Sequence, residues 1–208
     1  MKITVRIVSM VIIFSALYAI LRYNVFKGVE LTHFPLYIMN KILSFSGFIL
    51  LVSSFGLEPF YRKLGPAWFE MRKYLGRTGF VLIIMHIIMS FLLFRPEIYS
   101  KFFSGDGTLS AIGEWSLLFG TLGIAAYIIM HSSFFHMSEV NTYHKIIRSP
   151  AFGIAALLLS ALHVAIMGYK GWLTPHEWYG GMPSITMISI LVFIAGVTIF
   201  LAGQTKRQ

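Results

Sequence analysis

Two histidines, His86 and His163, lie within long apolar stretches and are the residues best placed to do chemistry in this sequence. An ionisable side chain at membrane depth is costly and rarely faces lipid, so each is a candidate functional residue. A neutral imidazole can titrate near physiological pH and is also the commonest metal ligand. The other five histidines lack apolar turns on both sides: His33, His131, His136, His144 and His176.

His86 and His163 are expected at the same depth in a membrane. His86 follows Arg72 by fourteen residues, and His163 follows Pro150 by thirteen. At 1.5 Å per residue, each imidazole lies about 20 Å from the inner face, in the outer half of the bilayer. Two imidazoles at one height on neighbouring helices can coordinate one iron across a bundle core. The spacing therefore predicts one haem between His86 and His163.

Small residues share the helical face of each histidine. They are Gly153, Ala156 and Ser160 before His163, and Gly76 and Gly79 before His86. A flat macrocycle between helices requires small side chains, and on this basis we predict that Gly79 and Ser160 contact the cofactor. Small residues also line ordinary helix–helix contacts in membranes, which is the structural alternative.

The chain contains no cysteine. This excludes disulfides, thiolate metal sites, iron–sulfur clusters and covalent attachment of c-type haem, so a haem would be held through histidine or methionine. A second haem nearer the inner face would need histidines about four turns earlier, where Arg72, Lys73, Ser149 and Pro150 stand. We predict one haem and leave a second open, because His131 and His144 offer a different geometry.

Membrane-spanning helices must position these residues, because the chain is 57% hydrophobic and only 12% charged. An apolar run of about 20 residues spans a bilayer. The sequence predicts an all-α polytopic bundle in a single domain, 1–208. Its six spans are Thr4–Leu21, Leu36–Leu57, Tyr74–Phe94, Gly113–Phe134, Pro150–Tyr169 and Pro183–Ala202.

The basic residues set the expected orientation. With the N-terminus inside, eleven Lys and Arg residues fall in inner segments and six in outer ones. The positive-inside rule then places both termini in the cytoplasm. The net charge of +9 fits contact with anionic headgroups rather than nucleic acid. The basic segment 58–73 is either a topology signal or a docking surface for an anionic cofactor or a reductase.

The pattern R-K-x-L-G-x-x-G-F-x(5)-H at 72–86, followed by Leu162-His163 in the fifth span, resembles the ferric-reductase-like transmembrane domain family. The resemblance covers about 40–171. Within that superfamily the chain is most similar to the bacterial haem-binding membrane subunit of the periplasmic methionine-sulfoxide reductase system. In those subunits the fifth span carries an inner histidine, whose position falls near Pro150 here, and His144 is displaced from it by several residues.

The resemblance implies a haem b cytochrome in the bacterial inner membrane, acting as the electron-transfer subunit of a transmembrane reductase. Its iron ligands would be His86 and His163. Arg72 and Arg77 match the basic helix start, where a haem propionate or a flavin phosphate would be met. Electrons would enter from a cytoplasmic flavin reductase, FMN, FAD or quinol, and leave to a periplasmic acceptor protein or small molecule.

Two other functions remain open from the residues alone. His86 and His163 could titrate in a small transporter or proton relay, although the spans lack the buried carboxylates and broken helices typical of transporters. The chain could also be a scaffold subunit without a cofactor.

Overall fold

The fold is an all-helical bundle, seen in a computed structural model that describes residues 2–133 and 142–205. The α-helices are α1 (Lys2–Ala19), α2 (Met39–Gly56), α3 (Glu58–Leu64), α4 (Pro66–Leu93), α5 (Ala111–Ser133), α6 (Thr142–Ile147), α7 (Pro150–Trp172) and α8 (Ile185–Thr205). Six helical segments are long and apolar enough to cross a membrane: 2–26, 31–56, 66–93, 111–133, 150–172 and 179–205. The predicted multi-pass helical protein is confirmed.

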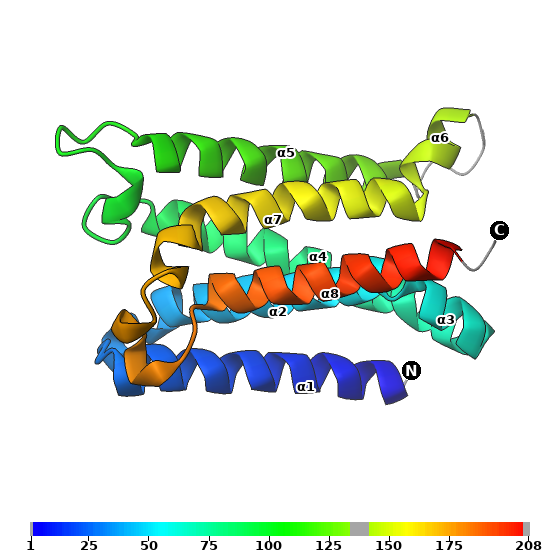
Figure 1. Ribbon diagram of the computed structural model, residues 1–208, viewed down its shortest axis with the longest axis horizontal. Coiled ribbons are helices and arrows are strands. Elements are labelled where there is room, and N and C mark those ends of the chain that lie inside the picture. The colour runs from blue at the N-terminus through cyan, green and yellow to red at the C-terminus, as the bar shows by residue number, and fades with distance from the viewer. Residues whose placement is uncertain (1, 134–141, 206–208) are drawn as a thin grey trace.

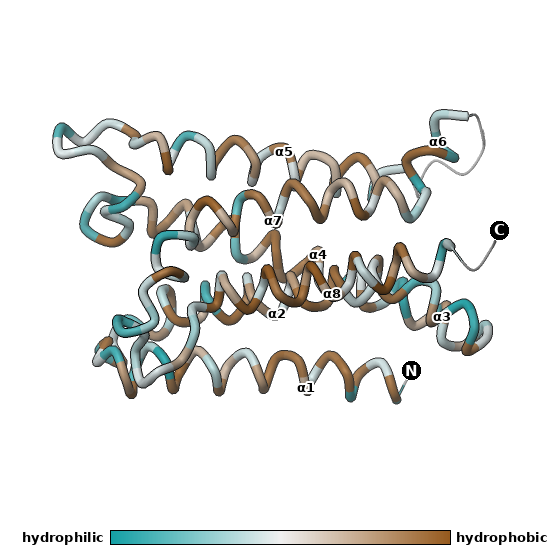
Figure 2. The backbone as a smooth tube through the Cα atoms, viewed as in Figure 1, coloured by the Kyte–Doolittle hydropathy of each residue, from teal (hydrophilic) through white to brown (hydrophobic). Residues whose placement is uncertain are grey.

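The two ends of the bundle differ in what they hold (Figure 1). Both ends of the described chain lie at one end, together with α3 and α6, and we call this the terminal end. The connections α1–α2, α4–α5 and α7–α8 lie at the opposite end, which we call the loop end. Figure 2 shows hydrophobic residues along the long helices and hydrophilic residues gathered in these connections. This pattern is the one expected of a bundle that crosses a bilayer.

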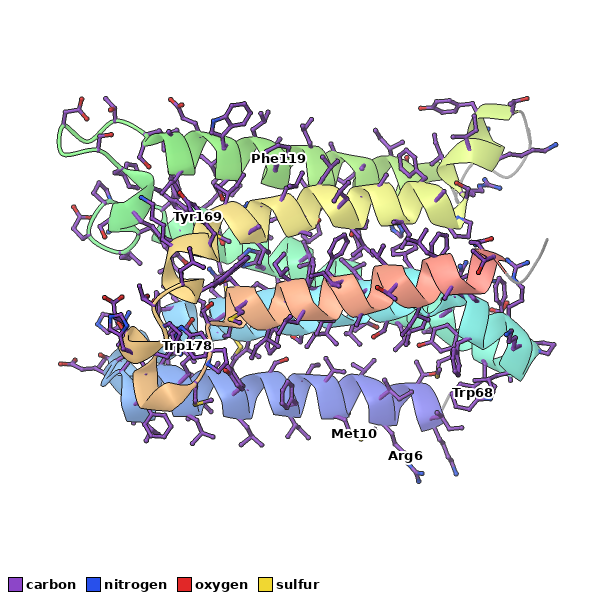
Figure 3. The ribbon with its side chains drawn as sticks, viewed as in Figure 1. Arg6, Met10, Trp68, Phe119, Tyr169 and Trp178 are labelled. Atoms are coloured by element: carbon purple, nitrogen blue, oxygen red, sulfur yellow. The ribbon has the colours of Figure 1, made fainter. Side chains whose placement is uncertain are left out.

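Helix α2 lies at the centre of the bundle, and thirteen of its eighteen residues are buried. It packs against α4, α8 and α1, whereas α5 packs mainly against α7. The α5–α7 pair joins the rest through contacts of α7 with α8 and α2. In Figure 3, Arg6 and Met10 of α1 point away from the bundle, as side chains of a lipid-facing helix do. His86 on α4 and His163 on α7 therefore belong to different helix pairs.

The segment 58–73, which falls between the second and third predicted spans, is helical over most of its length. It forms α3 and the first turns of α4, which begins at Pro66 rather than at Tyr74. Gly65 separates the two helices with a φ of 103°, and Pro66 then starts α4 at a position where its missing N–H costs nothing. Hydropathy marks only the apolar part of a helix, so it misses these basic turns.

The interior of the bundle is largely apolar. Nearer the terminal end, a cluster from α2, α5 and α7 includes Phe55, Tyr127 and Leu157. Toward the loop end a second apolar cluster is accompanied by buried polar side chains, among them Asn40 and Ser116. Both predicted iron ligands lie at this polar level.

Candidate functional site

The imidazole of His86 is fixed by Asn40 of α2. Its Nδ1 lies 2.6 Å from Asn40 Oδ1. The Asn40 amide nitrogen donates to Ser90 Oγ at 3.1 Å and to the Tyr99 hydroxyl at 3.0 Å, while the amide oxygen faces His86. A carbonyl oxygen cannot donate, so the His86 Nδ1 carries the proton.

The imidazole of His163 is fixed in the same way by α5. Its Nδ1 lies 2.7 Å from the main-chain oxygen of Ser116 and 3.0 Å from Ser116 Oγ. Gly120 stands one turn after Ser116, and a Cβ there would lie 2.9 Å from the His163 Nδ1. The glycine therefore leaves the Ser116 carbonyl open to the imidazole. Because the acceptor is again a carbonyl, His163 also carries its proton on Nδ1.

Both histidines consequently present an unprotonated Nε2 when neutral. In the part of the chain that the structure describes, neither Nε2 has a hydrogen-bond partner. Both imidazoles are only partly buried in the isolated chain, so neither ring is fully enclosed by protein. The two rings are close enough for the charge of His163 to act on His86. Metal-binding histidines show the same pattern, with Nδ1–H held by an oxygen and Nε2 free to bind.

Gly79 and Ser160, predicted from their helical faces, lie in contacts between helices. A Cβ at Gly79 would lie 2.9 Å from the Gly47 oxygen of α2. Ser160 donates to Ala156 O at 3.1 Å and stands opposite Gly123 of α5. The structure therefore gives these two residues roles in helix packing, and their predicted contact with a cofactor stays a prediction.

Arg72 and Arg77 lie toward the terminal end, on the far side of the apolar cluster from the histidine pair. The Arg72 guanidinium lies 4.7 Å from the centre of the Phe69 ring, and Arg77 is exposed. Along α4 they precede His86 by fourteen and nine residues, which correspond to about 21 and 14 Å. A group near the inner face could meet them, but they stand well away from the two imidazoles.

Three other histidines of the described chain, His131, His144 and His176, make contacts with residues outside this site. His131 packs against the Phe80 ring with the centres 5.0 Å apart. His176 lies 3.8 Å from the Glu177 carboxylate, and both side chains are exposed. His144 lies on α6 beside Tyr143, and His136 is outside the described residues.

A shallow cavity of about 290 Å³ opens at the terminal end, between α1 and α4. Its lining includes Lys2, Thr4, Trp68 and Met71. Trp68 supplies an aromatic surface and Lys2 a positive charge. The cavity is at the opposite end of the bundle from the histidine pair, so it belongs to a separate region.

Four residues around the histidines were missed by the sequence reasoning: Asn40, Lys41, Lys101 and Ser116. Asn40 and Lys41 fall inside a predicted span, and a polar pair at membrane depth is the same signal that drew attention to His86. The role of Ser116 rests on its main-chain oxygen, which no side-chain pattern reveals.

No protein-family profile matches this chain, and no curated protein sequence matches it. The functional assignment therefore rests on the geometry of the two histidines.

Proposed function

We propose that this chain is a membrane cytochrome that binds one haem b through Nε2 of His86 and Nε2 of His163. The observation that carries the proposal is the pair of Nδ1–H groups held by carbonyl oxygens of Asn40 and Ser116. Neutral imidazoles in this tautomer are suited to bind iron through Nε2. The absence of cysteine is consistent with a non-covalent haem.

The residues present fit a haem better than a bare metal ion. Among the described residues there is no group of three or more His, Asp or Glu side chains able to hold a metal ion. Two histidines on separate helix pairs supply two ligands, and a porphyrin supplies the other four. When bound, haem provides a one-electron couple between ferric and ferrous iron.

The protein's own contribution would be to orient and tune. Asn40 and Ser116 fix the two rings and make each Nε2 a stronger donor by accepting the Nδ1 proton. The apolar cluster on the terminal side keeps water away from that side of the site, and burial of this kind shifts a haem potential. No bond to a substrate has to form at an iron with two imidazole ligands.

The distribution of basic residues supports an orientation in the membrane, and this orientation suggests where electrons would enter and leave. The terminal end holds most of the Lys and Arg residues, so we place it in the cytoplasm of a bacterial inner membrane. A cytoplasmic flavin reductase, a flavin or a quinol would donate there, and the cavity between α1 and α4 is a candidate contact for such a donor. An acceptor protein or small molecule would meet the loop end. The resemblance to ferric-reductase-like domains supports the same direction.

Optical spectroscopy of the purified full-length chain tests the proposal. We expect a low-spin b-type spectrum on reduction, and its loss in His86→Ala and in His163→Ala. His176→Ala is the matched control, because that imidazole is exposed and its contact is with Glu177. A chain that stays colourless after haem is supplied, or that keeps the spectrum in both inner variants, would refute the assignment.

A proton relay is the second candidate, because a hydrogen-bonded chain runs from His86 through Asn40 to Tyr99 near the loop end. Histidine is the side chain most suited to carry protons near neutral pH. This function predicts colourless protein and a pH-dependent proton flux into liposomes that His86→Ala abolishes. A scaffold subunit, by contrast, predicts that both histidine variants assemble and behave as wild type.

A further inference from the structure

Two lysines, Lys41 and Lys101, stand at the loop-end side of the histidine pair. Lys41 directly follows Asn40, the hydrogen-bond partner of His86, and Lys101 contacts α7 one turn beyond His163. The two ammonium groups are also close enough to act on each other. The site therefore combines two metal-binding nitrogens with two adjacent cations.

Lys41 lies inside the second membrane-spanning segment, one residue after Asn40. Its Nζ lies 5.2 Å from the centres of the Tyr37 and Tyr99 rings. Contacts with ring faces offset part of the cost of removing an ammonium from water, but they supply no counter-charge. A lysine at this depth is a candidate functional residue for the same reason as His86.

Lys101 reaches the site from the segment between α4 and α5. Its Nζ donates to the main-chain oxygen of Met167 at 2.6 Å, one turn beyond His163 on α7. Although the side chain is exposed in the isolated chain, desolvation and then the charges of Lys41 and Lys27 lower its pKa to about 8. Lys101 therefore stands close enough to Lys41 for the two positive charges to repel each other.

No carboxylate balances these charges within the described part of the chain. The ion pairs found there are Arg62–Glu58, Lys73–Glu70 and His176–Glu177, and none includes either lysine. The five acidic residues toward the loop end are all exposed: Glu30, Glu97, Asp106, Glu114 and Glu177. Neighbouring cations are costly unless an anion joins them, above all where one of them, here Lys41, lies inside a membrane-spanning segment. The arrangement therefore indicates an anionic group between or beside the lysines.

We propose that Lys41 and Lys101 form a carboxylate-binding site for the two propionates of the haem. This inference rests on the proposed function, because the histidines define which molecule brings the carboxylates. Lysine ammonium groups bind carboxylates as compact point charges with three donors each. In this proposal the propionates contact Lys41 and Lys101 rather than Arg72 and Arg77, because the two arginines lie far from the imidazoles along α4.

The test compares haem b with its dimethyl ester, in which both propionates are uncharged. The full-length chain, prepared without haem in phosphatidylcholine nanodiscs, is titrated with each and followed optically. We expect wild type to prefer haem, with each lysine contributing about tenfold. Lys41→Gln with Lys101→Gln should bind the two compounds with equal affinity.

Two further variants separate charge from structure. Lys41→Arg with Lys101→Arg keeps both cations and should keep the preference for haem. Lys170→Gln removes an exposed charge at the same end and should leave both affinities unchanged.

The outcomes separate the two proposals. If wild type binds haem and its ester equally, or the double glutamine variant still discriminates, the propionate site is wrong while the cytochrome assignment stands. Equal loss of both compounds in the glutamine variant would also overturn it, because the lysines would then support the fold. If phosphatidylglycerol nanodiscs abolish the preference, the lysines bind lipid phosphate instead. If neither compound gives a b-type spectrum, both proposals fail.

Discussion

Replacing Asn40 with leucine is the sharpest test of how this site holds an imidazole. Leucine has a similar size but cannot accept the proton of His86 Nδ1, a nitrogen that lies 2.6 Å from Asn40 Oδ1 in the wild type. The change also removes the donor to Tyr99 and Ser90. His86 would lose the contact that fixes both its tautomer and its ring orientation.

The expected loss of haem affinity depends on which hydrogen-bond partner His86 keeps in the variant. Loss of a partner to a metal-binding histidine costs roughly 10- to 100-fold in metal affinity. Ser90 Oγ lies 3.4 Å from the His86 Nδ1 and can become a longer acceptor, so we expect the lower end. Haem affinity should therefore fall about tenfold, or about 1.4 kcal/mol. The midpoint potential should rise, because a less basic imidazole stabilises ferric iron less.

Optical haem titration and redox titration of the purified chain measure the two effects. Ser46→Ala is the matched control, since this buried hydroxyl of α2 donates only to Ile42 of its own helix. Asn40→Asp keeps an acceptor and makes it anionic, so haem should stay bound at a lower potential. If Asn40→Leu matches wild type in both affinity and potential, the Nδ1 contact does not control His86 and the reasoning is wrong.

Three further outcomes are expected. Gly120→Ala places a Cβ 2.9 Å from the His163 Nδ1, so optical titration should show about tenfold weaker haem binding. Gly79→Ala places a Cβ 2.9 Å from the Gly47 oxygen. Such overpacking should lower the free energy of unfolding by about 1–3 kcal/mol without changing the haem spectrum. The preference for haem over its ester should fall as pH rises through about 8, because desolvation and then the neighbouring lysines lower the pKa of Lys101 to about 8 and the side chain loses its proton there. Titrations at pH 6.5 and 9 would show no difference if Lys101 plays no part.

The helical bundle and the two central histidines could be predicted from the sequence because both depend on hydropathy. Long apolar runs define the spans, and one polar residue inside a run stands out against them. The predicted start of the fifth span at Pro150 was also correct. Pro150 is the first residue of α7, and the Ser149 side chain accepts a hydrogen bond from the Phe152 N–H. These features are local, so one stretch of chain is enough to reveal them.

The rest depends on which helix faces which. The spacing of Gly76 and Gly79 fits either a macrocycle or a neighbouring helix, and only the packing of α2 on α4 shows that the neighbour is a helix. The count of six outer basic residues includes Lys41, although the predicted span Leu36–Leu57 already places this lysine in the membrane. Ser116 acts through its backbone, and Gly120 matters by lacking a side chain.

His86 belongs to the α2–α4 pair and His163 to the α5–α7 pair, and this division has a consequence for the abundance of the protein in the cell. A ligand that binds both imidazoles would cross-link the two pairs, and free ligand at 100 times its Kd adds about 2.7 kcal/mol to stability. A chain made while haem is scarce would open more often along the line between the pairs. Membrane proteases act on such open states, so the abundance of this protein would rise and fall with the haem supply of the cell.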